Sequence, residues 1–263
     1  MDGRDAFAYM LMAAGTLGAS YLIGSELRRR TAIERRALRS APPVSMVPAG
    51  AHPNVIVIAP SWGSITMEEA ESFAQAIARA TGPVDIVLHT IGGSVLAVDY
   101  IANTIRKSPH PATAHVPYFA LSGGTMIALA CDSIAMNRDA ILGPVDPQVA
   151  GVAAVDLIDL VGRKPIEHID DQWMLLAIQS QKVLEETRST VEALVSSRAA
   201  VERLISGQTS HGRAITFDEA RELGLPIKDG VPSALTAALD VQIACARARQ
   251  HAFPSFHLAS RSR

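Results

Sequence analysis

Between residues 54 and 136, short apolar runs alternate with amphipathic segments, and this alternation restricts the chain to few folds. The runs at 54–59, 84–90, 112–118 and 133–136 are rich in β-branched residues, which is typical of strands buried on both faces. Helical spacing follows three of them, from Thr66 to Ala80, from Val95 to Lys107 and from Thr125 to Ala130. This order predicts parallel strands joined by helices, and therefore an α/β fold.

Two local signals refine the expected helices. Thr66 is followed three residues later by Glu69, which predicts a capping box at the start of the first helix. Residues 170–205 predict a long helical region that is broken once. At 100° per residue, the residues at 173, 176, 177, 180, 184, 187, 191 and 194 fall on one face of it.

Composition excludes several classes of protein. The 263 residues carry a formal net charge of −2, so no overall basic field indicates a nucleic-acid partner. The two cysteines, Cys131 and Cys245, form neither a disulfide framework nor a metal-binding spacing. We therefore expect no metal and no cofactor. Hydrophobic residues make up 48% of the chain, and part of this excess lies near the N-terminus.

Residues Ala6 to Gly24 form a run of nineteen without a charge. A helix of that length roughly matches a hydrocarbon core of about 30 Å. A signal peptide begins with basic residues, whereas the residues before this run are not basic overall. A cleaved signal peptide and a buried helix are the alternatives. Six arginines between Glu26 and Arg39 predict that the remaining chain faces the cytoplasm. We expect a membrane anchor at 1–25, a basic and proline-rich linker at 26–53, and a folded domain at 54–263.

Two glycine-rich turns follow predicted strands and precede predicted helices. The first contains Gly92 and Gly93, and the second contains Ser122, Gly123 and Gly124. Ligands in parallel sheets gather at the carboxyl ends of strands, so we expect both turns at one crevice. Free amides at a helix start favour a developing negative charge, and a serine beside them suits acyl transfer. The alternative is an ordinary N-cap serine followed by a tight turn.

Three segments resemble a known family. They are LHTIGG at 88–93, LSGGTMIALA at 121–130 and LGPVDPQ at 142–148, and they are similar to the membrane-associated serine dehydrogenase proteinase family. That family is similar to the proteolytic subunit of Clp protease and to signal peptide peptidase A, within the Clp/crotonase superfamily. The resemblance extends from Asn54 to His257.

The resemblance implies repeated ββα units and a membrane-anchored serine peptidase that cleaves polypeptides and forms a homo-oligomer. It implies that Ser122 is the nucleophile and that the amides of Gly93 and Gly123 bind the oxyanion. Gly92 and Asp146 are possible supporting residues. Asp146 either orients the site or caps a turn.

The general base is less simple to assign. Residues 141–148, where the Clp subunit would place a histidine, contain none. The signal-peptide-peptidase branch resembles a Ser–Lys dyad, and Lys182 falls where that family has a lysine. Apolar neighbours at Leu175 and Ile178 predict that Lys182 is desolvated, which would lower its pKa. The alternative is a solvated lysine paired with Glu186, and Lys164 is a second candidate base.

Two other functions stay open on the sequence. A crotonase-type acyl-CoA hydratase or isomerase stabilises a thioester enolate with two backbone amides, but it needs a glutamate pair that the glycine turns lack. A non-catalytic membrane scaffold would retain the same motifs for folding and oligomer contacts.

Overall fold

The computed structural model describes residues 45–46, 54–60, 64–207 and 212–252. The predicted anchor at 1–25 lies outside this range, as does nearly all of the predicted linker at 26–53. Among the described residues, none of the helices has the length and apolar character to cross a membrane.

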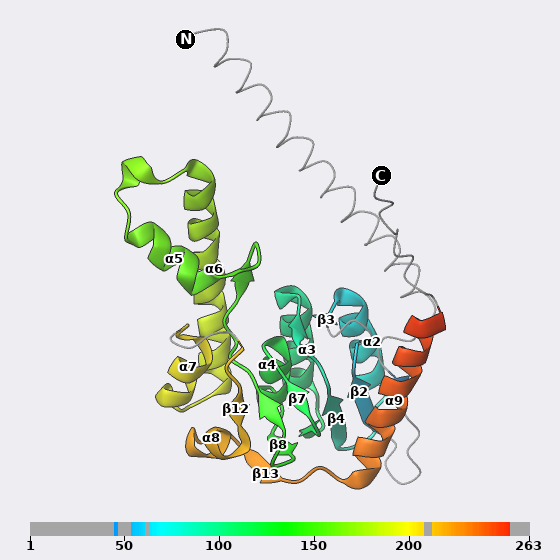
Figure 1. Cartoon of the computed structure of the whole chain (residues 1–263). Coiled ribbons are helices and arrows are strands. Elements are labelled where there is room, and N and C mark those ends of the chain that lie inside the picture. The colour runs from blue at the N-terminus through cyan, green and yellow to red at the C-terminus, as the bar shows by residue number, and fades with distance from the viewer. Residues whose placement is uncertain (1–44, 47–53, 61–63, 208–211, 253–263) are drawn as a thin grey trace, which may run out of the picture. The chain divides into compact units, whose positions relative to one another are not determined.

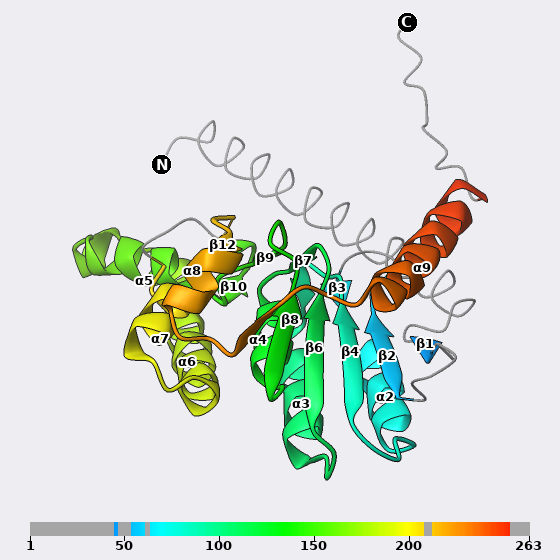
Figure 2. The same ribbon diagram turned by 90° about the horizontal axis from the view of Figure 1, so that it is seen from below.

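A six-stranded sheet forms the centre of the fold (Figures 1 and 2). Its order is β1 (Ser45–Met46), β2 (Val55–Ile58), β4 (Val84–Leu88), β6 (Ala112–Val116), β8 (Ser133–Met136) and β13 (Ile227–Asp229). Neighbouring strands from β2 to β13 are parallel, which confirms the predicted topology. Strand β1 is antiparallel to β2 and lies inside the predicted proline-rich linker, so the sheet begins before the predicted start of the folded domain.

Each of the first three long strands is followed by a two-residue strand and a helix. The three units continue with β3 (Ser64–Ile65) and α2 (Met67–Ile77), β5 (Gly92–Gly93) and α3 (Val95–Lys107), and β7 (Phe119–Ala120) and α4 (Gly123–Leu129). Strand β3 pairs with β5, and β7 pairs with β9 (Ile141–Leu142). The predicted ββα repeat is confirmed. Helix α4 begins two residues before its predicted start, because Gly123 and Gly124 are helical.

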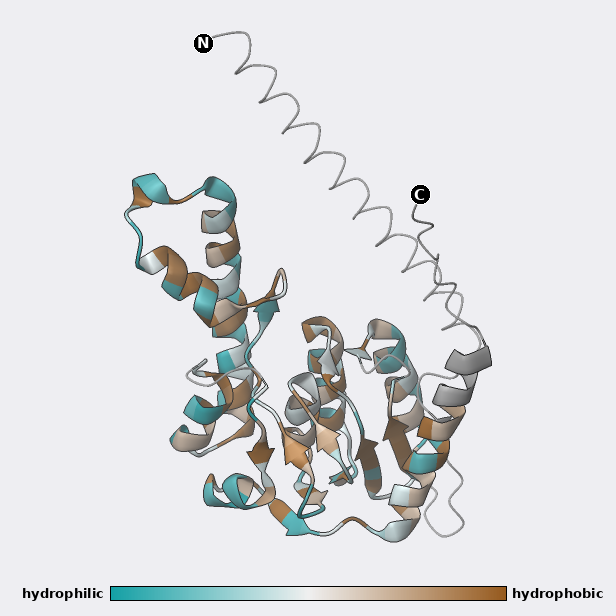
Figure 3. Cartoon of the chain, in the orientation of Figure 1, coloured by the Kyte–Doolittle hydropathy of each residue, from teal (hydrophilic) through white to brown (hydrophobic). Residues whose placement is uncertain are grey.

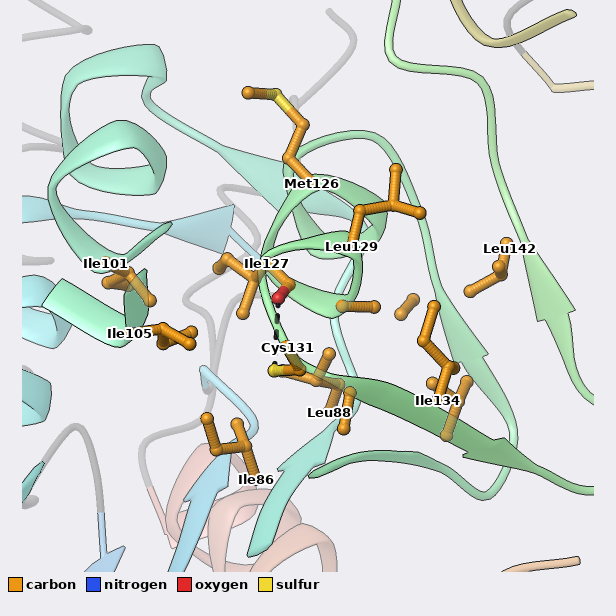
Figure 4. Packing of buried hydrophobic residues seen from close by; sticks show 14 of the residues in the cluster. Ile86, Leu88, Ile101, Ile105, Met126, Ile127, Leu129, Cys131, Ile134 and Leu142 are labelled. Atoms are coloured by element: carbon orange, nitrogen blue, oxygen red, sulfur yellow. Dashed lines mark hydrogen bonds between the residues drawn. The ribbon is translucent and has the colours of Figure 1, made fainter. Parts of the chain in front are cut away.

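The two faces of the sheet pack against different helices. Ile56, Ile86 and Ile134 belong to the main core, together with residues of α2, α3 and α4. Figure 4 shows this core around Cys131, whose Sγ donates to the carbonyl oxygen of Ile127. On the other face, a smaller cluster joins the strands to α9 (Ser233–Ala252). Strands β2 and β4 are strongly hydrophobic (Figure 3), as expected for strands covered on both faces.

A helical arm follows β9. It contains the hairpin of β10 (Gln148–Val149) and β11 (Val152–Ala153), then α5 (Ala154–Gly162), the 3-10 helix η1 (Ile166–His168), α6 (Asp171–Leu194) and α7 (Arg198–Ile205). The break between α6 and α7 confirms the predicted interruption, and the buried residues of α6 lie on the predicted face. Figure 1 shows α5 and the first half of α6 extending beyond the sheet. The chain returns through β12 (Ile215–Thr216), which pairs with β9, and α8 (Phe217–Glu222).

Candidate active site

Ser122 stands at the junction of β7 and α4 in an unusual backbone conformation. Its φ of 50° and ψ of −118° place a non-glycine residue at positive φ, a conformation that costs free energy and is concentrated at functional sites. Its side chain is half-buried and makes no capping hydrogen bond to α4. Ser122 thus occupies the N-cap position of α4, but its hydroxyl does not cap the helix, so the capping hydrogen bond of an ordinary N-cap serine is not formed.

The two glycine turns adjoin, as the parallel topology predicts. A Cβ built on Gly92 would lie 2.8 Å from the Cβ of Ser122 and 3.1 Å from the nitrogen of Gly123. Gly92 has a φ of +115°, which only glycine adopts without strain. The turns are also joined by the N–H of Leu121, which donates to the carbonyl oxygen of Thr90 at 2.9 Å.

Gly123 begins α4, and its backbone lies directly against α3. A Cβ at this position would collide with the side chain of Val98, so the close approach of the two helices requires glycine. The N–H of Gly124 donates to Leu121 at 2.8 Å, and the N–H of Met126 donates to Ser122 at 3.2 Å. The Gly123 amide belongs to the first turn of the helix, where N–H groups have no intrahelical partner and the dipole favours negative charge.

Gly93 lies in β5, pressed against β3. A Cβ at this position would collide with the backbone of Ile65. The N–H of Ser94 donates to the carbonyl oxygen of Ile65 at 2.9 Å. Successive N–H groups of an extended strand point to opposite sides, so the Gly93 N–H points away from β3.

The segment after β9 lies beside Leu121, the residue before Ser122. Gly143 donates its N–H to the Thr125 hydroxyl at 3.1 Å, and that hydroxyl lies 2.8 Å and 2.9 Å from the carbonyl oxygens of Ala120 and Gly143. Thr125 therefore has a structural role. Further along the segment, Asp146 is 3% exposed and accepts a hydrogen bond from Gln148 Nε2 at 3.3 Å.

Lys182 lies on α6 and is exposed, so the expected desolvation is wrong for the single chain. The reason is that its neighbours Leu175 and Ile178 are themselves 61% and 45% exposed. Lys182 borders an open pocket of about 420 Å³ together with Glu185, Glu186, Ser189 and Thr190. No hydrogen bond or ion pair between described residues joins it to Ser122. Lys164, the second candidate base, is also exposed.

Electrostatics connect this part of α6 to α3. Burial raises the pKa of the Asp99 carboxyl, and the nearby charge of Glu186 raises the pKa of Asp99 further. Asp99 lies six residues after Gly93 in the chain, and Glu186 lies one helical turn after Lys182. The surface of α6 that carries Lys182 is thus electrostatically coupled to the helix that follows the first glycine turn.

A His–Asp pair is present elsewhere in the sheet. His115 Nε2 lies 2.7 Å from Asp85 Oδ1. His115 pairs with Val87 across the strands, and Val87 belongs to the cluster that packs against α9. The pair therefore lies on the face opposite α4 and supplies no base to Ser122. Within the described part of the chain, no cluster of three or more His, Cys, Asp or Glu residues is arranged to hold a metal ion.

Thr90 is a site residue that sequence reasoning missed. It is fully buried, and its hydroxyl lies within hydrogen-bond distance of both backbone polar groups of Gly92. A threonine at the end of a strand is common, so the sequence carries no signal for this contact.

Sequence comparison identifies relatives. The profile of the ClpP-like SDH-type serine proteinase family matches residues 7–253. Two uncharacterized proteins of Methanocaldococcus jannaschii are 35% and 30% identical, over 69% of this chain in each case. The alignments cover 67% and 65% of those proteins, so the chain spans about two thirds of their length.

Solved structures with a similar chain course have low sequence identity. A mutant of a membrane-bound stomatin-specific protease has a TM-score of 0.48 at 20% identity, over 68% of this chain and 77% of that chain. ClpP1 from Listeria monocytogenes has a TM-score of 0.49 at 17% identity, over 69% of this chain and 94% of the ClpP1 chain. An enoyl-CoA hydratase from Mycobacterium avium subsp. paratuberculosis has a TM-score of 0.45 at 19% identity, over 78% of this chain and 74% of the hydratase chain.

The family profile covers nearly the whole chain, including the ββα repeats and both glycine turns. The chain therefore belongs to the family of ClpP-like SDH-type serine proteinases, and it is a serine peptidase with a ClpP-like α/β fold.

Proposed function

We propose that this peptidase cleaves peptide bonds with the hydroxyl of Ser122 as its nucleophile. The observation that carries the proposal is the positive-φ backbone of Ser122, which leaves its side chain uncommitted at the start of α4. Ser122 Oγ attacks the carbonyl carbon, the C–N bond breaks, and the amine leaves with a proton. Water then hydrolyses the acyl-enzyme and restores the hydroxyl.

The amides of Gly93 and Gly123 bind the oxyanion in this proposal. The close approach of the Gly92 backbone to Ser122 and Gly123, which leaves no room for a Cβ, supports it because the two turns lie directly against each other. Backbone donors fixed in advance stabilise charge that develops only in the transition state. The family assignment favours this chemistry over that of an acyl-CoA hydratase.

Lys182 is the proposed base. Its neutral amine would take the proton of Ser122 Oγ and pass it to the leaving amine. Because Lys182 is exposed in the single chain, we propose that a second copy of the chain either covers it or supplies it. Exposed apolar side chains on the helical arm support a homo-oligomer, among them Ile166 at 71% and Trp173 at 46% exposure.

Membrane anchoring is a proposal that rests on the sequence alone. The uncharged segment at 6–24 would anchor the chain, and the arginines after it would keep the peptidase domain in the cytoplasm. Release of the full-length protein from membranes by alkaline carbonate would contradict an integral anchor. Protease accessibility in inverted and right-side-out vesicles tests the orientation.

A fluorophosphonate probe tests the nucleophile. The probe phosphonylates an activated serine and releases fluoride, so it should label the wild type and leave Ser122→Ala unlabelled. Equal labelling of the two proteins would refute the assignment. For the base, Lys182→Ala should abolish peptide hydrolysis. Lys228→Ala, at an exposed lysine on β13, is the matched control and should leave hydrolysis unchanged.

A further inference from the structure

Thr90 makes two hydrogen-bond contacts to a single glycine. Its Oγ1 accepts the N–H of Gly92 at 3.1 Å and lies as a donor 3.2 Å from the carbonyl oxygen of Gly92. Thr90 is 0% exposed, so water does not compete for these contacts. The hydroxyl thus contacts both polar groups of a residue whose φ of +115° lies outside the usual range.

The hydrogen bond from the Thr90 hydroxyl to the Gly92 carbonyl oxygen also restricts the backbone of Gly93. The carbonyl group of Gly92 and the N–H of Gly93 belong to one peptide unit, which is planar and trans. In a trans peptide the C=O and N–H point in opposite directions. A hydrogen bond that holds the Gly92 oxygen therefore also holds the direction of the Gly93 N–H. The pairing of β5 with β3 also restrains this peptide, and the Thr90 hydroxyl adds a second restraint at two residues that have no Cβ to limit their backbone.

Thr90 also contacts the second glycine turn. Its carbonyl oxygen accepts the N–H of Leu121 at 2.9 Å. Its Cγ2 methyl is the nearest atom to the space beside Gly124, where a built Cβ would stand 2.7 Å away. One buried side chain thus sets the first turn through its hydroxyl and packs against the second turn through its methyl group.

We propose that Thr90 is a positioning residue, whose hydroxyl acts together with the pairing of β5 with β3 to keep the Gly92–Gly93 peptide from flipping and the Gly93 N–H directed at the oxyanion. This proposal rests on the proposed function, in which Gly93 is an oxyanion donor. Thr90 itself does not touch the substrate. A flipped peptide would present the Gly92 carbonyl oxygen to the oxyanion in place of an N–H and would repel it.

Two substitutions separate the hydroxyl from the methyl group. Thr90→Val keeps the shape but removes the hydroxyl, and Thr90→Ser keeps the hydroxyl but removes the methyl. Loss of one oxyanion donor typically slows catalysis by about 10²–10³-fold, so a peptide that flips part of the time should cost about tenfold or more. We expect Thr90→Val to lower the maximal rate of fluorophosphonate labelling by this factor with little change in the half-saturating probe concentration. Thr90→Ser should restore most of the rate.

A matched control and a second measurement complete the test. Thr113→Val removes a hydroxyl that lies 3.3 Å from Ser133 Oγ in the same sheet, away from the glycine turns, and should label normally. Amide hydrogen exchange of Gly92 should accelerate in Thr90→Val and stay slow in Thr90→Ser. If Thr90→Val does not fold, Thr90→Ala removes the hydroxyl without crowding and takes its place.

The outcomes separate this proposal from the proposed function. If Ser122→Ala is unlabelled but Thr90→Val labels at the wild-type rate, or slows no more than Thr113→Val, only the positioning role is overturned. If Ser122→Ala is labelled like the wild type, both proposals are overturned. Slow labelling of Thr90→Val with rescue by Thr90→Ser, and with faster exchange at Gly92, supports the role.

Discussion

Replacement of Gly92 by alanine should damage stability and reactivity together, and the structure supplies both magnitudes. The φ of +115° costs an alanine about 1–3 kcal/mol. The new Cβ would stand 2.8 Å from the Cβ of Ser122, about 0.6 Å inside an ordinary contact at 3.4 Å. Crowding of this kind costs about 1–3 kcal/mol more. We therefore expect Gly92→Ala to lower the free energy of unfolding by about 2–6 kcal/mol.

The rate of fluorophosphonate labelling should also fall, because the new alanine Cβ would push Ser122 away from its native position. A misplacement of 1 Å costs roughly a hundredfold in rate, so a shift of about 0.6 Å should slow fluorophosphonate labelling by about ten- to twentyfold. The rate is compared under conditions in which the variant is fully folded. Stability is measured by urea unfolding.

Gly224→Ala is the matched control. Gly224 has a φ of +79°, and a Cβ built on it meets nothing within 4 Å. This variant carries a backbone cost of about 1–2 kcal/mol without crowding and should label at the wild-type rate. If Gly92→Ala were no less stable than Gly224→Ala and labelled equally fast, the two turns would not form one site as described.

Three further predictions concern other parts of the fold. Glu69→Ala removes half of a capping box and should lower the free energy of unfolding by about 1 kcal/mol in urea titrations, and an unchanged midpoint would contradict this. The hydrogen bond to Asp240 raises the pKa of Tyr118, so Asp240→Asn should lower the pKa of Tyr118 in an absorbance titration. Because the pKa is raised in the folded protein, the contribution of this hydrogen bond to stability should be lost as the pH rises above about 10. Burial raises the pKa of Cys131 to about 12, so this thiol should not react with iodoacetamide in the native protein. Peptide mapping should find the exposed Cys245 modified in the native protein and Cys131 modified only after unfolding.

The elements with strong periodicity were predictable from the sequence. Helix α3 begins and ends as expected at Val95 and Lys107, and the capping box of Thr66 and Glu69 forms with both of its hydrogen bonds. These features depend on residues close together in the chain. The meeting of the two glycine turns was also predictable, because parallel strands bring their carboxyl ends to one edge whatever the intervening sequence.

Features that depend on tertiary contact were not predictable. The two-residue strands β3 and β5 have no periodicity of their own and form because Ile65 and Gly93 pair across the chain. The positive φ of Ser122 follows from the constrained junction of β7 with α4, which no propensity reveals. The exposure of Lys182 depends on which side of α6 faces the core, and the apolar neighbours that suggested burial are exposed with it.

If Ser122 is the nucleophile as proposed, its backbone conformation lowers stability at the residue that catalysis requires. A non-glycine residue at a φ of 50° and a ψ of −118° costs about 1–3 kcal/mol, whereas glycine would relax the junction at an entropic cost of about 0.5–1 kcal/mol in the unfolded chain. Ser122→Gly should thus yield a peptidase that is inert yet slightly more stable than the wild type, while Ser122→Ala retains the strain. For an experiment that traps bound peptides on an inactive enzyme, glycine is the better substitution. Selection for folding alone would remove this serine, so its presence in so costly a conformation points to selection for activity.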